Sequence, residues 1–156
     1  MSYDFNADEV FEMAAQIERN GAKFYRDAAQ SVSGSKEKEL LTSLAEMEID
    51  HIAIFEQLHQ EISKKEKEKR VFDPEDESVL YLQALADTKV FYEKEIDTTS
   101  IREILKAALL AEKDAIVFYL GLKDLVPAEL GKDKIDNIIK EEMQHVRLLG
   151  NKLTNL

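Results

Sequence analysis

The chain has 156 residues, including five glycines, two prolines and no cysteine, and it carries a formal net charge of −11. The absence of cysteine excludes disulfides, cysteine-ligated iron–sulfur clusters, thiolate metal sites and thiol catalysis, and the negative charge makes nucleic acid an unfavourable partner. No apolar run is long enough for a membrane span, and "MSYDFNADEV" at the start lacks the features of a signal peptide, so we expect a cytoplasmic protein without a membrane partner.

Long segments rich in Ala, Leu, Glu and Lys favour an all-helical protein. We expect the first helix to begin after Asn6, with Glu9 completing a capping box and with Phe5 and Val10 forming a hydrophobic staple. Its apolar residues recur at alternating intervals of three and four, and the loop "SVSGS" (31–35) is expected to end it.

The second helix is predicted over about residues 36–66, and a long connection, residues 67–99, follows it. Within this connection, Asp73 and Pro74 are typical of an N-cap and a first helical residue, so we expect a short helix there that ends near Ala86. A connection of this length can cross from one end of a helical bundle to the other.

The third long helix is expected to begin after Ser100, with Glu103 completing a second capping box, and to stop near residues 126–127. A fourth helix then continues to about Lys152. Two helical hairpins result, at residues 6–66 and 100–154. We therefore predict a single all-α domain over residues 1–156, a four-helix bundle of two hairpins whose long crossover carries a short extra helix.

The second hairpin aligns with the first at an offset of 94 residues. The helix caps coincide at this offset, and so do Phe24–Tyr25 and Phe118–Tyr119. The charged residues that coincide are Glu18 with Glu112, Glu48 with Glu142, and His51 with His145. We interpret the half-chains as copies of one helical hairpin.

These charged residues fall on the apolar stripes of their helices and at one level of the bundle. In each hairpin the two glutamates lie 15 residues from the turn, at Ser33 or Pro127, on either side of it. That level is roughly 22 Å from the turn, so all four carboxylates are expected to meet in one layer, and the histidines one helical turn away would join them. The candidate metal ligands are Glu18, Glu48, His51, Glu112, Glu142 and His145.

Four buried carboxylates without cations would be severely destabilising, and two divalent metal ions would balance their charges. One glutamate from each of two helices and Glu-x-x-His from each of the other two make a dinuclear carboxylate site. Oxygen ligands combined with imidazole suit iron or manganese, and zinc is an alternative. The competing interpretation is a pair of ordinary core histidines with glutamates in salt bridges.

A third Glu-x-x-His pair, Glu56 and His59, provides an internal control. This pair lies off the apolar stripe, and its counterparts at the offset of 94 residues are Gly150 and Leu153, which are not metal ligands. We therefore interpret it as a surface pair.

Four further residues near the candidate ligands require an interpretation. Tyr25 and Tyr119 follow two of the glutamates by seven residues, and they either hydrogen-bond to the ligating carboxylates or pack as core aromatics. Glu46 and Glu141 lie close to the ligands in sequence, but at helical spacing they are expected to point elsewhere.

With these residues the chain resembles the rubrerythrin-like branch of the ferritin-like superfamily, over nearly its whole length. The motifs that carry the resemblance are "IERNGAKFY" (17–25), "EIDH" (48–51), "EKDAIVFY" (112–119) and "EMQH" (142–145). It implies a ferritin-like bundle, two iron ions bridged by Glu48 and Glu142, and a homodimer. It also implies non-haem di-iron redox chemistry, with hydrogen peroxide or dioxygen as the oxidant.

The chain departs from the rubrerythrin pattern in two respects. Because it has no cysteine, it lacks the rubredoxin-like domain, and its electrons would come from a separate donor such as a rubredoxin. Rubrerythrins also carry a second glutamate three residues after the third-helix ligand, whereas this chain has Ala115. That difference bears on peroxidase efficiency and leaves the expected site more symmetric. The alternative hypotheses are iron oxidation and storage in a cage, and a non-catalytic bundle stabilised by metal.

Overall fold

The computed structural model describes residues 6–68, 73, 75–87 and 100–156, and this part of the chain is helical and without strands. Its long helices are α1 (Ala7–Ser31), α2 (Ser35–Glu68), α4 (Ile101–Leu125) and α5 (Lys132–Thr154), and α3 (Glu77–Asp87) is shorter. The all-α prediction and the four long helices are confirmed. None of the described helices is both long enough and apolar enough to cross a membrane.

Both helix caps that the sequence predicts are present. The Asn6 side chain accepts a hydrogen bond from the Glu9 backbone N–H at 3.0 Å, and Ser100 accepts one from the Glu103 N–H at 3.3 Å. Each contact satisfies a backbone donor that the first turn of a helix leaves without a partner. Phe5 of the expected hydrophobic staple lies outside the described residues.

The short helix α3 begins three residues later than predicted. The Asp76 side chain accepts a hydrogen bond from the Ser78 N–H at 2.8 Å and therefore caps the helix. Asp73 instead accepts a bond from the backbone N–H two residues later, at 3.0 Å, and forms the turn that precedes the helix. Pro74, the expected first helical residue, lies outside the described residues.

The last helix also begins later than predicted, because a 3₁₀ turn (Ala128–Leu130) follows Pro127. Gly131 then adopts a left-handed conformation with φ of 109° directly before α5. A φ of this size favours glycine, and a Cβ atom on Gly131 would also meet the end of the Leu58 side chain.

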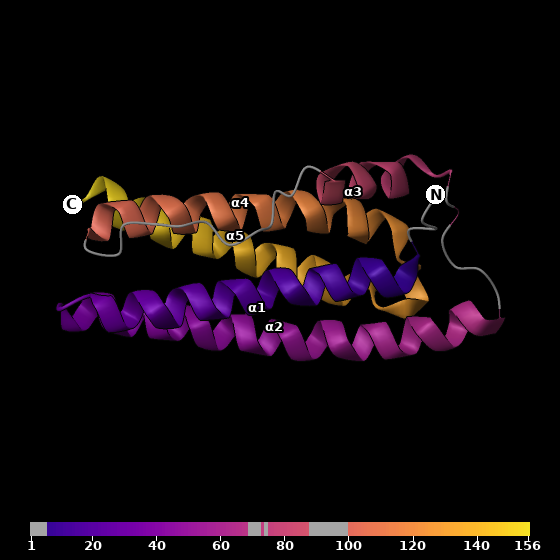
Figure 1. Cartoon of the computed structure of the whole chain (residues 1–156), viewed down its shortest axis with the longest axis horizontal. Coiled ribbons are helices and arrows are strands. Elements are labelled where there is room, and N and C mark those ends of the chain that lie inside the picture. Colours follow the sequence, from indigo (N-terminus) through magenta and orange to yellow (C-terminus); the bar gives the residue numbers. More distant parts are fainter. Residues whose placement is uncertain (1–5, 69–72, 74, 88–99) are drawn as a thin grey trace.

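The helices form two hairpins, α1 with α2 and α4 with α5, which pack through α1 against α4 and α2 against α5 (Figure 1). Helix α3 lies on the outside of α4, where the Tyr81 hydroxyl donates to the Val117 carbonyl at 2.8 Å. Gly121 permits this approach, because a Cβ there would lie 2.7 Å from the Tyr81 ring. The predicted pair of hairpins and the extra helix of the crossover are therefore both present.

A polar layer divides the hydrophobic core into two clusters. The larger cluster contains Phe11, Phe55 and Phe118, and the smaller one contains Leu41 and Leu105. On each of the four long helices, the residues of the two clusters are separated by one or two buried charged side chains. The fold thus places one ionisable layer across the middle of an otherwise apolar bundle.

Candidate metal centre

All four long helices contribute to the polar layer, which consists of the six candidate ligands. Helix α1 supplies Glu18, α2 supplies Glu48 and His51, α4 supplies Glu112, and α5 supplies Glu142 and His145. Each is at most 4% exposed, and no other charged side chain of the described residues is buried to this extent. The spacing of three residues within Glu-x-x-His places both side chains on one helix face, as predicted from the sequence.

The six residues form two overlapping groups of four. In each group the four ligand atoms, one from each residue, all lie within 4.8 Å of one another. The groups are Glu18, Glu48, His51 and Glu142, and Glu48, Glu112, Glu142 and His145. Because Glu48 and Glu142 belong to both groups, they are placed to bridge two cations, as expected for a dinuclear carboxylate site.

The inward-facing atoms of this layer lack hydrogen-bond partners. Seven buried side-chain atoms in the described part of the chain have none, and all belong to the six residues: Glu18 Oε2, Glu48 Oε1, His51 Nδ1, Glu112 Oε2, both oxygens of Glu142, and His145 Nδ1. His51 Nδ1 lies 2.8 Å from Glu142 Oε1, yet neither atom makes a well-directed hydrogen bond. Buried polar atoms normally have partners, so oxygens and imidazole nitrogens that converge in this way fit bound cations.

Protons take the place of cations in the metal-free layer. Burial, and then the charge of Glu18, raises the pKa of Glu48 well above its usual value. Burial, and then the neighbouring Glu112 carboxyl, raises the pKa of Glu142 well above its usual value. Burial by itself would lower the pKa of His51, but Glu142 and Glu18 together outweigh it and raise the pKa to about 11. Since metal ligands must be deprotonated, these protons have to leave when a cation binds.

The two tyrosines hydrogen-bond across the bundle rather than within their own hairpins. The Tyr25 hydroxyl donates to Glu112 Oε1 at 2.6 Å, and the Tyr119 hydroxyl donates to Glu18 Oε1 at 2.7 Å. Burial, and then the charge of the facing glutamate, raises the pKa of both phenols well above 10, so both remain hydrogen-bond donors. Each contact leaves the Oε2 atom of its glutamate free to face the layer.

The outer contacts of the two histidines were not foreseen from the sequence. Glu141 was expected to point elsewhere, but its Oε2 lies 2.5 Å from His51 Nε2, so that prediction is wrong. Helical spacing sets only the direction of Cβ, and the long side chain of Glu141 reaches from α5 across to α2. His145 Nε2 faces Met47 Sδ at 3.3 Å. Glu46 is exposed and makes no described contact with the layer.

Gly21 is a second residue whose role was not foreseen. A Cβ atom at this position would lie 3.1 Å from Glu48 Oε2, so glycine leaves room for that carboxylate. A glycine inside a helix costs about 1 kcal/mol relative to alanine, which makes its presence opposite a candidate ligand informative. Its counterpart at the offset of 94 residues is Ala115, which is buried with 4% exposure.

The third Glu-x-x-His pair lies apart from the layer, as the repeat argument predicted. His59 Nε2 contacts Asp8 Oδ1 at 2.9 Å, and Glu56 pairs with Arg19 at 3.3 Å. The His59 side chain is 28% exposed. Its sequence spacing alone therefore does not make a metal site.

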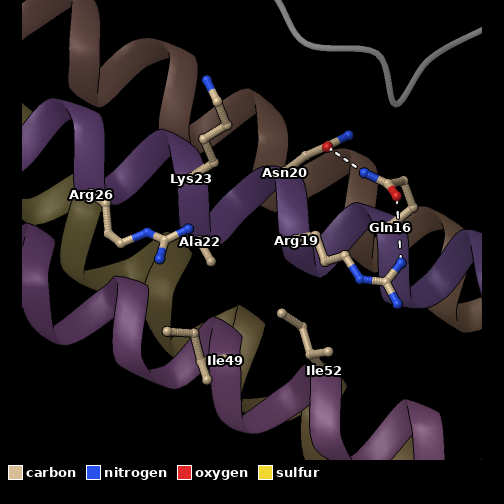
Figure 2. A pocket seen from close by; sticks show the side chains of 8 residues that line it. All are labelled: Gln16, Arg19, Asn20, Ala22, Lys23, Arg26, Ile49 and Ile52. Atoms are coloured by element: carbon tan, nitrogen blue, oxygen red, sulfur yellow. Dashed lines mark hydrogen bonds between the residues drawn. The ribbon is translucent and has the colours of Figure 1, made fainter.

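An open groove between α1 and α2 runs over the outer surface of the bundle (Figure 2). It is lined by Gln16, Arg19, Asn20, Ala22, Lys23, Arg26, Ile49 and Ile52. Figure 2 shows Gln16 hydrogen-bonded to both Asn20 and Arg19. Arg19 also pairs with two glutamates and Lys23 with Asp27, so much of the positive charge is neutralised, and the groove contributes no residue to the two ligand groups.

The fold and the buried carboxylate–histidine layer define a ferritin-like bundle with a candidate dinuclear metal centre. The family model of rubrerythrin matches residues 9–149, and the chain belongs to the rubrerythrin family. A crystal structure of a Thermotoga maritima protein, assigned to the ferritin-like diiron-carboxylate proteins, has the same fold, with a TM-score of 0.72 and 24% sequence identity. The similarity covers 96% of this chain and 95% of that one. No curated protein matches the chain at a significant level.

Proposed function

We propose that the chain is a non-haem di-iron oxidoreductase that reduces hydrogen peroxide, or dioxygen, with electrons from a separate donor. The observation that supports this most directly is the pair of overlapping ligand groups that share Glu48 and Glu142. The family favours iron as the metal, and manganese or zinc would also suit the ligands. Two bound iron ions would supply two electrons, one each, by cycling between the ferrous and ferric states.

The side chains of the layer have separate tasks in this proposal. The four carboxylates balance the charge of two divalent ions, and the two imidazoles each offer Nδ1 as a ligand. Tyr25 and Tyr119 hold the two carboxylates that are not shared. The apolar clusters on either side of the layer limit the access of bulk water.

Reduction of one peroxide molecule to two water molecules consumes two electrons and two protons. Two ferrous ions supply the electrons in one turnover, and an external reductant has to restore them. The 156 residues contain no cysteine and therefore no thiolate iron site, so we propose a separate electron donor such as a rubredoxin.

The test begins with metal-free protein that receives two equivalents of ferrous iron without oxygen. One equivalent of hydrogen peroxide should oxidise both irons, and reduced rubredoxin should support repeated turnover. His51→Ala should abolish most of this activity, whereas His59→Ala, the matched histidine outside the layer, should retain it. The proposal is wrong if fewer than one iron binds per chain, or if the ferrous protein reacts with neither peroxide nor dioxygen.

The alternative functions predict different particles and stoichiometries. We propose a homodimer, with twice the 17.9 kDa mass of the chain, which light scattering or sedimentation can measure. Iron storage requires a closed multi-subunit shell and an iron content well above two per chain. A structural metal would bind at the same residues without any spectral change when peroxide is added.

A further inference from the structure

The two histidines of the layer have the same inner surroundings but different outer contacts. Both Nδ1 atoms face carboxylates of the layer: His51 Nδ1 lies 2.8 Å from Glu142, and His145 Nδ1 lies 3.3 Å from Glu112. Their Nε2 atoms face outward, that of His51 to Glu141 Oε2 at 2.5 Å and that of His145 to Met47 Sδ at 3.3 Å. One imidazole therefore donates to a carboxylate and the other to a thioether.

The internal repeat shows that this difference arises at a single position. At the offset of 94 residues, Glu141 corresponds to Met47, just as His145 corresponds to His51. The ligands coincide in type between the halves, and the tyrosine contacts match closely, at 2.6 and 2.7 Å. The two subsites therefore match in their ligands and differ in the residue that contacts the outer nitrogen of each histidine, Glu141 for His51 and Met47 for His145.

The chemical consequence follows from the strength of the two acceptors. A carboxylate that accepts the Nε2–H bond fixes the tautomer with the Nδ1 lone pair inward and increases electron donation from that atom to a metal. A thioether sulfur is uncharged and only a weak acceptor. Loss of such outer partners typically costs about 10–100-fold in metal affinity. The Glu141 side chain is 43% exposed, which places the expected effect near the lower end of that range.

We propose that the two metal subsites are unequal, and that a divalent cation fills the subsite of Glu18 and His51 before the subsite of Glu112 and His145. The preference is about tenfold, and Glu141 and Met47 set it. This inference rests on the proposed metal centre and adds an order of loading to it. Glu141 acts through His51 as a positioning residue and does not itself belong to either ligand group.

The experiment is a titration of metal-free protein with Zn²⁺, followed by NMR of nitrogen-15-labelled histidine. The chain has three histidines, so each ring is resolved, and His59 serves as an internal control outside the layer. Zinc undergoes no redox reaction, so the readout is independent of enzymatic activity. With one equivalent of zinc, His51 Nδ1 should show the bound shift while His145 remains largely free, and the second equivalent should convert His145.

Two variants assign the preference to the outer partners. Glu141→Met gives both histidines a thioether and should make them fill together. The double exchange Met47→Glu with Glu141→Met preserves composition and net charge, and it should reverse the order, so that His145 fills first. Glu46→Gln, which removes an exposed charge beside the ligands on α2, is the control and should leave the order unchanged. Helical content measured by circular dichroism verifies that each variant is folded.

The outcomes separate this inference from the proposed function. If both histidines of the parent protein fill together, or if the double exchange keeps the parental order, the inference is wrong while the metal centre stands. If neither His51 nor His145 responds to zinc and ferrous iron does not bind, the metal centre itself is wrong. Early filling of His51 with reversal in the double exchange establishes the inference.

Discussion

Removal of the metals should reverse the pH dependence of stability between neutral and mildly acidic solution. In the metal-free protein, the raised pKa values of Glu48, Glu142 and His51 mean that the folded chain holds protons that the unfolded chain has released. A raised folded-state pKa gives stability that is complete below the unfolded pKa and is lost as pH rises through the folded one. The metal-free form should therefore become more stable on acidification.

The size of this effect follows from proton linkage. Each excess proton changes the free energy of unfolding by about 1.4 kcal/mol per pH unit. The pKa of His51 rises from 6.5 to about 11. The unfolded-state imidazole takes up part of a proton between pH 7.5 and 6.5, so the contribution of His51 over this interval is about 1 kcal/mol. Each raised carboxyl adds to this down to its unfolded pKa of 4.5. Burial by itself would raise the pKa of Glu112, but the neighbouring Glu142 carboxyl and the charge of His145 outweigh burial and lower this pKa, so Glu112 opposes the trend only below about pH 4.5.

Zinc-loaded protein should show the opposite trend, because protons compete with the metal for its ligands. The assay is urea unfolding of both forms at about pH 5.5 and 7.5, with the free energy of unfolding as the readout. Glu142→Gln removes one of the titrating carboxyls and should flatten the metal-free trend, whereas the exposed Glu46→Gln should not. Parallel changes in the metal-free and zinc-loaded forms would refute the reasoning.

Three further substitutions test the surroundings of the layer. Tyr119→Phe removes the 2.7 Å hydrogen bond to Glu18 and should lower metal-free stability by about 1–2 kcal/mol, measured by urea unfolding; an unchanged stability would show that the bond contributes nothing. Gly21→Ala should preserve metal-free stability or raise it by up to about 1 kcal/mol. The same substitution should weaken zinc binding in calorimetry, because its methyl group would meet Glu48 Oε2 at 3.1 Å. An unchanged zinc affinity would contradict this prediction. Ala115→Glu should cost about 1–3 kcal/mol through overpacking and alter the ferric absorption spectrum and peroxide turnover. A folded, iron-loaded Ala115→Glu protein with the parental spectrum and rate would show that this position does not face the metals.

The candidate ligands could be predicted from the sequence because their positions depend on geometry within each hairpin. The helical period puts Glu48 and His51 on one face, and equal distances from a turn put residues of adjacent helices at one level. The structure brings Glu18, Glu112 and the Glu-x-x-His pairs together at that level. The boundaries of the single domain, the homodimer and the electron donor stay predictions.

Features that depend on contacts between helices could not be predicted from the sequence in this way. The hydrogen bonds of Tyr25 and Tyr119 join different hairpins and depend on how α1 packs against α4. The spacing of residues along one helix gives no information about this packing. The reach of Glu141 to His51 depends on the separation of α5 and α2, and its repeat counterpart, Met47, gave no polar signal to follow. The start of α5 depends on the left-handed Gly131.

The site is symmetric in its ligands, as expected from the sequence, but not in the residues behind those ligands. The replacement of a rubrerythrin glutamate by Ala115 does leave two ligand groups of the same composition, each with three glutamates and one histidine. Symmetry in ligand type does not extend to the atoms behind the ligands, since Glu141 supports His51 and Met47 supports His145. Differences between subsites in such a repeat have to be sought one contact further from the metal than the ligands themselves.

In the proposed metal centre, protons and metals would be alternative occupants of the same layer, which would connect folding to function. A bundle with four ionised buried carboxylates and no cation would be too costly to fold. The raised pKa values of Glu48, Glu142 and His51 reduce that cost, so the chain can form its layer before metal arrives. In the proposed centre, a divalent cation would displace these protons, because metal ligands have to be deprotonated.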